Sequence, residues 1–209
     1  MTKAMGTVRV LAWCGIIAPL LRLSLIVSLG ALDPDYSQVR DYISELSAKG
    51  APFAFTMNAF GLSLVGGLLI AFSAALYRAA RPGFFAALGT ALLASSGLAF
   101  MVVALFPCDP GCSLEAPSAT MRVHVVAGAT AMATQTLAPI AFGVHFAQAR
   151  AKRYAVVSLA LGTVALIALV LLFGLGSGLT WPGLPQKIFQ FAADIWVLIS
   201  AIFILRYRR

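Results

Sequence analysis

The sequence predicts an all-α membrane protein, a six-helix transmembrane bundle with a short amphipathic interfacial helix in its first outer loop, as one domain over residues 1–209. Of its residues, 61% are hydrophobic and only 11% are charged, whereas a soluble domain carries about 25% charged residues. The mean hydropathy is +0.94. The apolar residues also gather into six long runs, and roughly 20 apolar residues suffice for one membrane crossing.

Each run is long enough for a helix that satisfies its own backbone hydrogen bonds in lipid. The runs fall near 9–32, 53–77, 84–106, 122–148, 154–175 and 187–205. The first run follows Lys3 and Arg9 and ends near small residues, which also suits a cleaved signal peptide. A signal peptide has an apolar core of only about 7 to 15 residues, and this run is longer and contains Arg22. We therefore predict a retained span.

The placement of the charged residues predicts the orientation of the helices. One set of connections, together with the chain ends, holds ten basic residues and no acid: Lys3, Arg9, Arg78, Arg81, Arg150, Lys152, Arg153, Arg206, Arg208 and Arg209. The other connections hold Asp33, Asp35, Asp41, Glu45, Asp109 and Glu115 with Arg40, Lys49, Arg122 and Lys187. Because basic loops stay in the cytoplasm, we expect both termini to be cytoplasmic. The net charge of +8 is then an orientation signal, and we expect no nucleic-acid partner.

The first outer loop contains a helical pattern. Val39, Tyr42, Ile43 and Leu46 recur at helical spacing, which predicts an amphipathic helix from Tyr36 to Ala48. Asp35 with Gln38 resembles a capping box, and Gly50 and Pro52 would end the helix. A helix of this length lies on the membrane surface or caps the bundle. It serves either as a connector or as a lid over an outward-facing cavity.

Two cysteines in the next outer loop predict a disulfide. Cys108 and Cys112 flank an Asp-Pro-Gly turn, and an oxidising compartment outside the cytoplasm permits their oxidation. A metal site is the competing interpretation, but two cysteines supply only half of a tetrahedral ligand set. Cys14, in the first run, is expected to be a packing residue.

Two charges inside the spans predict an ion pair. Arg22 lies roughly 15 Å below the outer end of the first run, and Asp194 lies roughly 10 Å below Lys187 in the last. Charges are costly in lipid and pair with one another. The pair either locks two helices together or takes part in ligand binding or proton transfer. Lys187, Gln190 and Asp194 share one helix face, which Asn58 and Gln135 would join.

His124 opens the fourth run, next to Arg122. At that interface it would serve acid–base chemistry with Glu45 or Asp109, or metal binding with those residues or Glu115. The second histidine, His145, lies 21 residues further along the same helix, about 30 Å away at the helical rise. A site with two histidines is thereby excluded if the helix is continuous. We expect a hydrogen-bonded interfacial histidine, with no metal and no cofactor.

The glycines of the runs predict close contacts between helices rather than ligand sites. They are Gly61, Gly66, Gly67, Gly89, Gly97 and Gly128.

Several motifs resemble one family across nearly the whole chain. They are Pro34-Asp35-Tyr36 with Ile43-Ser44-Glu45-Leu46, Phe106-Pro107 with Asp109, His124, and Trp181-Pro182-Gly183-Leu184-Pro185-Gln186-Lys187. Together they look like the bacterial and archaeal domain-of-unknown-function family numbered 998. The resemblance implies a six-span protein of a prokaryotic cytoplasmic membrane with no assigned activity. The cysteine pair is not part of the family pattern.

Two functions remain open. In the first, the protein binds, moves or modifies an outer-leaflet lipid or small amphiphile in a polar cavity that opens to the outside, with membrane lipids as its partners. The reacting residues would be His124, Glu45 and Asp109, and the ligand-binding residues Tyr36, Ser44, Arg22, Arg122, Trp181, Gln186, Lys187, Gln190 and Asp194. In the second, the protein is a non-catalytic scaffold or accessory subunit, in a homo-oligomer or with a partner membrane protein.

Overall fold

The computed structural model describes residues 2–175 and 180–207, and within these ranges it is all helical, with no strand. Six of its helices are long and apolar enough to cross a membrane, which confirms the predicted fold class. They are α1 (Thr2–Leu32), the continuous stretch of α2 (Ala54–Thr56), the π-helix η2 (Met57–Leu64) and α3 (Val65–Ala79), then α4 (Phe84–Leu105), α5 (Ala119–Gln148), α6 (Lys152–Leu175) and α7 (Gly183–Tyr207).

The helix ends lie close to the predicted ones. The largest difference is at the start of α1, which begins at Thr2 rather than near residue 9. The helix α7 begins at Gly183 rather than near residue 187. Pro185 therefore lies in the first turn of α7, where a missing N–H and a fixed φ suit a helix. The π-helix Met57–Leu64 was not predicted, because hydrophobic periodicity does not distinguish it from the α-helix around it.

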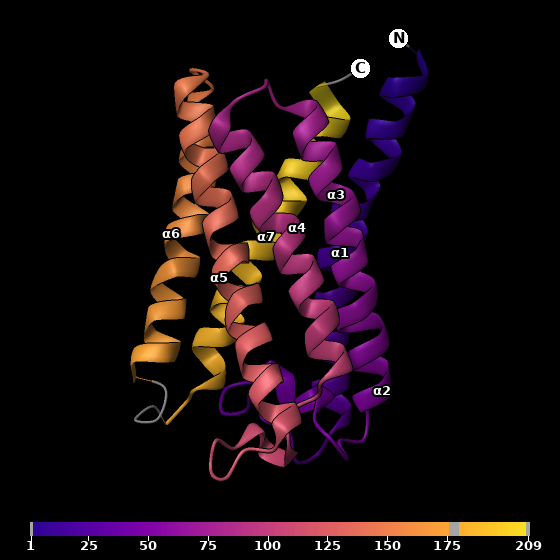
Figure 1. The fold of residues 1–209 in the computed structure, drawn as a ribbon, viewed down its shortest axis with the longest axis vertical. Helices are drawn as coiled ribbons and strands as arrows, with labels where there is room; N and C mark the ends of the chain where they lie inside the picture. Colours follow the sequence, from indigo (N-terminus) through magenta and orange to yellow (C-terminus); the bar gives the residue numbers. More distant parts are fainter. Residues whose placement is uncertain (1, 176–179, 208–209) are drawn as a thin grey trace.

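The six spanning helices form a closed bundle. Each packs against its neighbour in the chain, and α1 also packs against α7 (Figure 1). Both ends of the chain lie at one end of the bundle, which we call the terminal end. We call the opposite end, which carries residues 33–53 and 106–118, the loop end. Ten large apolar side chains on α1 and α6 are among those exposed on the outside of the bundle, as lipid contact requires: Val10, Trp13, Ile17, Leu20, Val27, Val156, Val164, Ile167, Val170 and Phe173.

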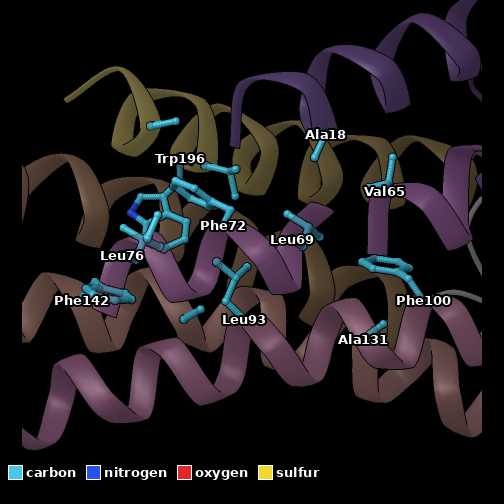
Figure 2. Packing of buried hydrophobic residues seen from close by; sticks show 14 of the residues in the cluster. Ala18, Val65, Leu69, Phe72, Leu76, Leu93, Phe100, Ala131, Phe142 and Trp196 are labelled. Carbon is cyan, nitrogen blue, oxygen red and sulfur yellow. The ribbon is translucent and has the colours of Figure 1, made fainter. Parts of the chain in front are cut away.

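The core lies between α3, α4, α5 and α7. Phe72, Leu93, Phe142 and Trp196 are buried there (Figure 2). The rings of Phe142 and Trp196 have centroids 5.7 Å apart. The indole N–H of Trp196 donates a 3.0 Å hydrogen bond to Ser158 Oγ on α6. This bond satisfies the one polar group of a fully buried side chain.

Glycines allow several helices to approach closely. A Cβ at Gly66 would meet the backbone of Gly97, and a Cβ at Gly89 would overlap the ring of Phe142. The predicted packing role is thus confirmed at these positions. It is wrong at Gly67 and Gly128, where a Cβ would meet nothing within 4 Å.

The helix predicted from Tyr36 to Ala48 is present only as a five-residue 3₁₀ helix, η1 (Ile43–Ser47). The residues before it make side-chain contacts with the backbone: the Asp41 carboxylate accepts from the Ser37 N–H at 2.6 Å, and Gln38 donates to the Ile26 carbonyl of α1 at 2.9 Å. The predicted Asp35–Gln38 capping box is therefore wrong. Glu45 provides the cap instead, accepting from the Tyr42 N–H at 2.8 Å.

Beyond η1, Gly50 has a φ of +82°, a conformation that favours glycine. The helical segment itself ends earlier than predicted, at Ser47, with Ala48 as its C-cap. The first loop covers the loop end of the bundle. Leu46 is almost fully buried, in a cluster with Ile26 and Met57.

Candidate functional site

Two residues at the start of α7 fasten the first loop to the bundle. Gln186 Oε1 accepts a 2.6 Å hydrogen bond from the Ile43 N–H. Lys187 Nζ donates to the Asp41 carbonyl at 2.7 Å and lies 5.1 Å from the centroid of the Tyr36 ring. The backbone of Gly183 also donates to the Arg40 carbonyl at 3.0 Å. The Gln-Lys pair of the family-like motif thus has a structural role in this chain.

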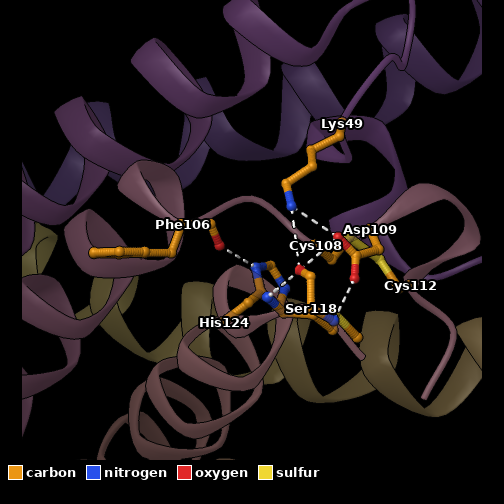
Figure 3. Close-up of polar contacts among 8 residues, drawn as sticks. Lys49, Phe106, Cys108, Asp109, Cys112, Ser118 and His124 are labelled. Atoms are coloured by element: carbon orange, nitrogen blue, oxygen red, sulfur yellow. Dashed lines mark hydrogen bonds and ion pairs between the residues drawn. A yellow bond between two sulfur atoms is a disulfide. The ribbon is translucent and has the colours of Figure 1, made fainter. Parts of the chain in front are cut away.

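Asp109 fixes the second loop. Its carboxylate accepts from Lys49 Nζ at 2.8 Å, and from the hydroxyl and N–H of Ser118 at 2.8 and 2.9 Å (Figure 3). The hydrogen bond from Lys49, followed by those from Ser118, lowers the pKa of Asp109 to about 2. Ser118 Oγ also accepts from the Met121 N–H at 3.1 Å, which caps α5. Asp109 is therefore an ionised structural anchor rather than a free base.

The structure joins Cys108 and Cys112 in the predicted disulfide. The short helix η3 (Pro110–Cys112) forms the turn between them. Both sulfur atoms lie beside Ser44, with the Ser44 carbonyl 3.4 Å from Cys108 Sγ and the Ser44 hydroxyl 3.4 Å from Cys112 Sγ. The Lys49 N–H donates to the Cys108 carbonyl at 3.0 Å. These contacts hold the first and second loops together.

Half-burial affects two acidic groups of the first loop. Burial raises the pKa of Glu45, and the hydrogen bond from the Tyr42 N–H partly offsets this effect. Burial, followed by the charge of Glu45, raises the pKa of Tyr36. The Tyr36 hydroxyl has no hydrogen-bond partner within the described residues.

A buried charged cluster lies between α1 and α7. Arg22 is 1% exposed and Asp194 is 5% exposed. Arg22 Nε donates to Asp194 Oδ2 at 3.2 Å, and Arg22 Nη2 contacts Asp194 Oδ1, so the predicted ion pair is present. With its amide oxygen facing the guanidinium, Gln190 accepts from Arg22 Nη2 at 2.8 Å. Arg22 Nη1 is buried with no partner among the described residues.

His124 is 7% exposed, and its Nδ1 lies 2.9 Å from the Phe106 carbonyl oxygen (Figure 3). A carbonyl oxygen only accepts hydrogen bonds, so Nδ1 carries the proton. This leaves Nε2 as an acceptor in the neutral ring. Among the described residues, no hydrogen bond joins any two of His124, Glu45 and Asp109. The structure does not bring the three proposed reacting residues together as an acid–base pair.

The loop end encloses a cavity of about 800 Å³, which we call the loop-end cavity. Its roof comes from the first and second loops and the start of α7, where Ser44, Cys112 and Gln186 contribute. Arg22 and Gln190 lie at its deep end. Its walls are mainly apolar: Leu62, Phe100, Val103, Met121, Val125, Gly128, Ala129, Met132, Leu172, Phe173 and Phe189. Leu114 and Phe173 are 68% and 57% exposed and mark where the cavity meets the surface.

Of the residues proposed from the sequence, five line this cavity: Arg22, Ser44, His124, Gln186 and Gln190. Asp194 forms an ion pair with one of them, Arg22. The other six are not among its lining residues: Tyr36, Glu45, Asp109, Arg122, Trp181 and Lys187. Trp181 is 59% exposed, and Arg122 lies on a different surface.

Arg122 borders a groove of about 610 Å³ between α4 and α5. The groove is lined otherwise by small and apolar side chains, among them Leu98, Val102 and Val126. Leu98 and Val126 are exposed. The groove therefore belongs to the outer surface of the bundle and not to the loop-end cavity.

The sequence did not identify the cavity walls, and it offered Glu115 only as a metal partner of His124, not as a residue at the mouth of the cavity. Apolar residues such as Phe100 and Met132 look the same in a sequence whether they face lipid, a neighbouring helix or a cavity. Gly128 was assigned to packing. The wall residues come from five separate helices. Only the packing of these helices in three dimensions brings the residues around one cavity.

Within the described residues, no group of three or more His, Cys, Asp or Glu side chains is placed to hold a metal ion. The family described as "Protein of unknown function (DUF998)" matches residues 16–202, in agreement with the resemblance noted from the motifs. No curated protein and no solved structure matches the chain.

Proposed function

We propose that this chain, a polytopic membrane protein that belongs to the DUF998 family, binds an outer-leaflet lipid or a small amphiphile of similar shape in the loop-end cavity. The observation that carries the proposal is the combination of apolar walls with a buried guanidinium whose Nη1 has no partner among the described residues. Small-molecule sites are typically apolar hollows of about 300 to 1,000 Å³ with a few placed polar groups.

The position of the cavity supports a lipid ligand. Arg22 lies roughly 15 Å from the loop end of α1 at the helical rise, so the cavity extends into the depth of the hydrocarbon layer. Phe173 is exposed on the outer surface of α6 and also lines the cavity. It would therefore form part of a route by which a lipid enters the cavity from the membrane. The basic residues concentrated at the terminal end favour a cytoplasmic location for that end. The cavity would then face the outer leaflet.

The alternative is a non-catalytic scaffold or accessory subunit. One observation favours it over an enzyme: Asp109 and Glu45 are both engaged in structural hydrogen bonds. Binding without catalysis is compatible with the same contacts. The proposal therefore assigns a binding role to the cavity and gives no catalytic step to these carboxylates.

A substitution that fills the cavity tests the proposal. Gly128 lines the cavity, and a Cβ there would meet nothing within 4 Å. We expect Gly128→Phe to occupy the ligand space without disturbing the helices. Gly67→Phe is the matched control, because Gly67 has the same free space and does not line the cavity.

The measurement is native mass spectrometry of each full-length variant, purified in a mild uncharged detergent from the membranes in which it is made. The unchanged protein and Gly67→Phe should retain a bound lipid, and Gly128→Phe should lose it. Equal amounts of bound lipid in both variants would contradict the proposal. The absence of any bound lipid in the unchanged protein would favour the scaffold.

A further inference from the structure

We infer that the lipid of the loop-end cavity has an uncharged, hydroxyl-bearing head group, as in a diacylglycerol or a polyprenol, rather than an anionic phosphate head. This inference rests on the proposed function and names its ligand class. Three features of the cavity lead to it: one unpartnered donor, one acceptor, and a charge balance that leaves no place for an anion.

The donor is Arg22 Nη1. It is buried with no hydrogen-bond partner among the described residues, and the guanidinium carbon lies 4.8 Å from the centroid of the Phe100 ring. A buried donor is costly when left unsatisfied. An oxygen atom of the ligand, either a carbonyl or a hydroxyl, would satisfy it.

The charge balance excludes a second anion at that donor. Among the described residues, Arg22 and Glu115 are the formally charged side chains that line the cavity, and Asp194 already neutralises Arg22 through two contacts. Together the three side chains carry a formal charge of −1. A phosphate head group would add a further negative charge without a free cation beside it, and an uncompensated buried charge is strongly unfavourable.

The acceptor is His124 Nε2. Because Nδ1 donates to the Phe106 carbonyl, Nε2 is the ring nitrogen left for a ligand, and in the neutral ring it accepts. A hydroxyl group donates to such a nitrogen. A fully ionised phosphate offers only acceptor oxygens and has no proton to donate to that nitrogen.

Four pure lipids test the inference on the purified full-length protein in uncharged detergent, with affinities measured by native mass spectrometry. Dioleoylglycerol and a polyprenol supply uncharged hydroxyl heads on different tails. Dioleoylphosphatidate carries the same acyl chains with a phosphate. The 3-acetyl ester of dioleoylglycerol lacks the hydroxyl donor. We expect dioleoylglycerol or the polyprenol to bind at least about tenfold more tightly than phosphatidate and the acetyl ester.

Two variants separate the contributions. Glu115→Gln changes an exposed residue at the mouth of the cavity and removes its negative charge without disturbing the buried cluster. The difference in affinity between dioleoylglycerol and phosphatidate should therefore become smaller. The double variant Arg22→Leu with Asp194→Leu removes the donor without leaving a lone charge, and should weaken dioleoylglycerol binding about tenfold.

Tighter binding of dioleoylglycerol or of the polyprenol than of phosphatidate and the acetyl ester supports the inference. The one of these two lipids that binds more tightly identifies the kind of tail. Phosphatidate binding equal to or tighter than both overturns it, while loss of phosphatidate binding in Gly128→Phe would still uphold the proposed function. If Gly128→Phe and Gly67→Phe bind every lipid alike, the proposed function itself fails.

Discussion

Arg22 and Asp194 are placed where each charge depends on the other. Both are almost fully buried, between α1 and α7. Removing one partner of such a pair leaves an uncompensated charge, at a cost of about 3–5 kcal/mol. We expect Arg22→Leu and Asp194→Leu each to destabilise the protein by about that amount, and the double variant to be more stable than either. Denaturant unfolding in detergent, analysed as a double-mutant cycle, measures the coupling.

If the effects of Arg22→Leu and Asp194→Leu add without coupling, the pair is not an energetic unit. A matched comparison comes from Gln190→Leu combined with Asp194→Leu. That combination leaves the guanidinium without either of its two partner side chains. It should therefore be at least as unstable as Asp194→Leu alone.

Asp109 gives a prediction on pH. Its pKa is lowered from 3.8 to about 2 by Lys49 and Ser118, so its contribution to stability is fully present above pH 3.8. That contribution is lost as the pH falls through about 2. We expect the difference in melting temperature between the unchanged protein and Asp109→Asn to be constant from neutral pH to about pH 4. Thermal unfolding at a series of pH values should show the difference shrink towards pH 2. A constant difference down to pH 2 would contradict the assignment.

At the scale of the elements, the first loop depends on the start of α7. Gln186 Oε1 is the acceptor for the Ile43 N–H, and Ile43 is buried. Gln186→Ala would leave that N–H unsatisfied, at a cost of about 1–3 kcal/mol. We expect faster hydrogen exchange in residues 41–47, measured by mass spectrometry in detergent, with little change in α4 and α6.

The control for this measurement is Trp181→Ala. Trp181 precedes α7, and its side chain is mostly exposed. Its substitution should leave exchange in residues 41–47 unchanged. Equal acceleration by Trp181→Ala and Gln186→Ala would show that any change near this turn loosens the loop.

The spanning helices were predictable because apolar runs of spanning length leave the backbone few alternatives in lipid. The structure of the first loop was not predictable, because its apolar residues have helical spacing while its polar side chains bind the backbone. Asp41 accepts from the Ser37 N–H, and Gln38 donates to the Ile26 carbonyl of α1. Short polar side chains such as Asp commonly offer the backbone an alternative to helical hydrogen bonds. The ion pair was predictable from its cost in lipid. The cavity was not predictable, since nothing in the sequence shows that Phe100 and Gly128 face a cavity rather than lipid or a neighbouring helix.

At the scale of the whole molecule, the charges and the disulfide both bear on orientation. The connections and chain ends assigned to the terminal end hold ten basic residues and no acid in the sequence, and the positive-inside rule places such an end in the cytoplasm. The disulfide Cys108–Cys112 lies at the loop end, and disulfides persist in oxidising compartments. Both features lead us to expect a cytoplasmic location for the terminal end.

We therefore expect both termini to be cytoplasmic, and single cysteines test this. In a Cys14→Ala background, Val39→Cys places a thiol at an exposed position of the loop end, and Ala149→Cys places one at an exposed turn of the terminal end. Cys108 and Cys112 are paired and do not compete. A membrane-impermeant maleimide added to intact cells should label Val39→Cys, and should label Ala149→Cys only after permeabilisation. The reverse pattern would place the loop-end cavity on the cytoplasmic side, and an outer-leaflet ligand would then be excluded.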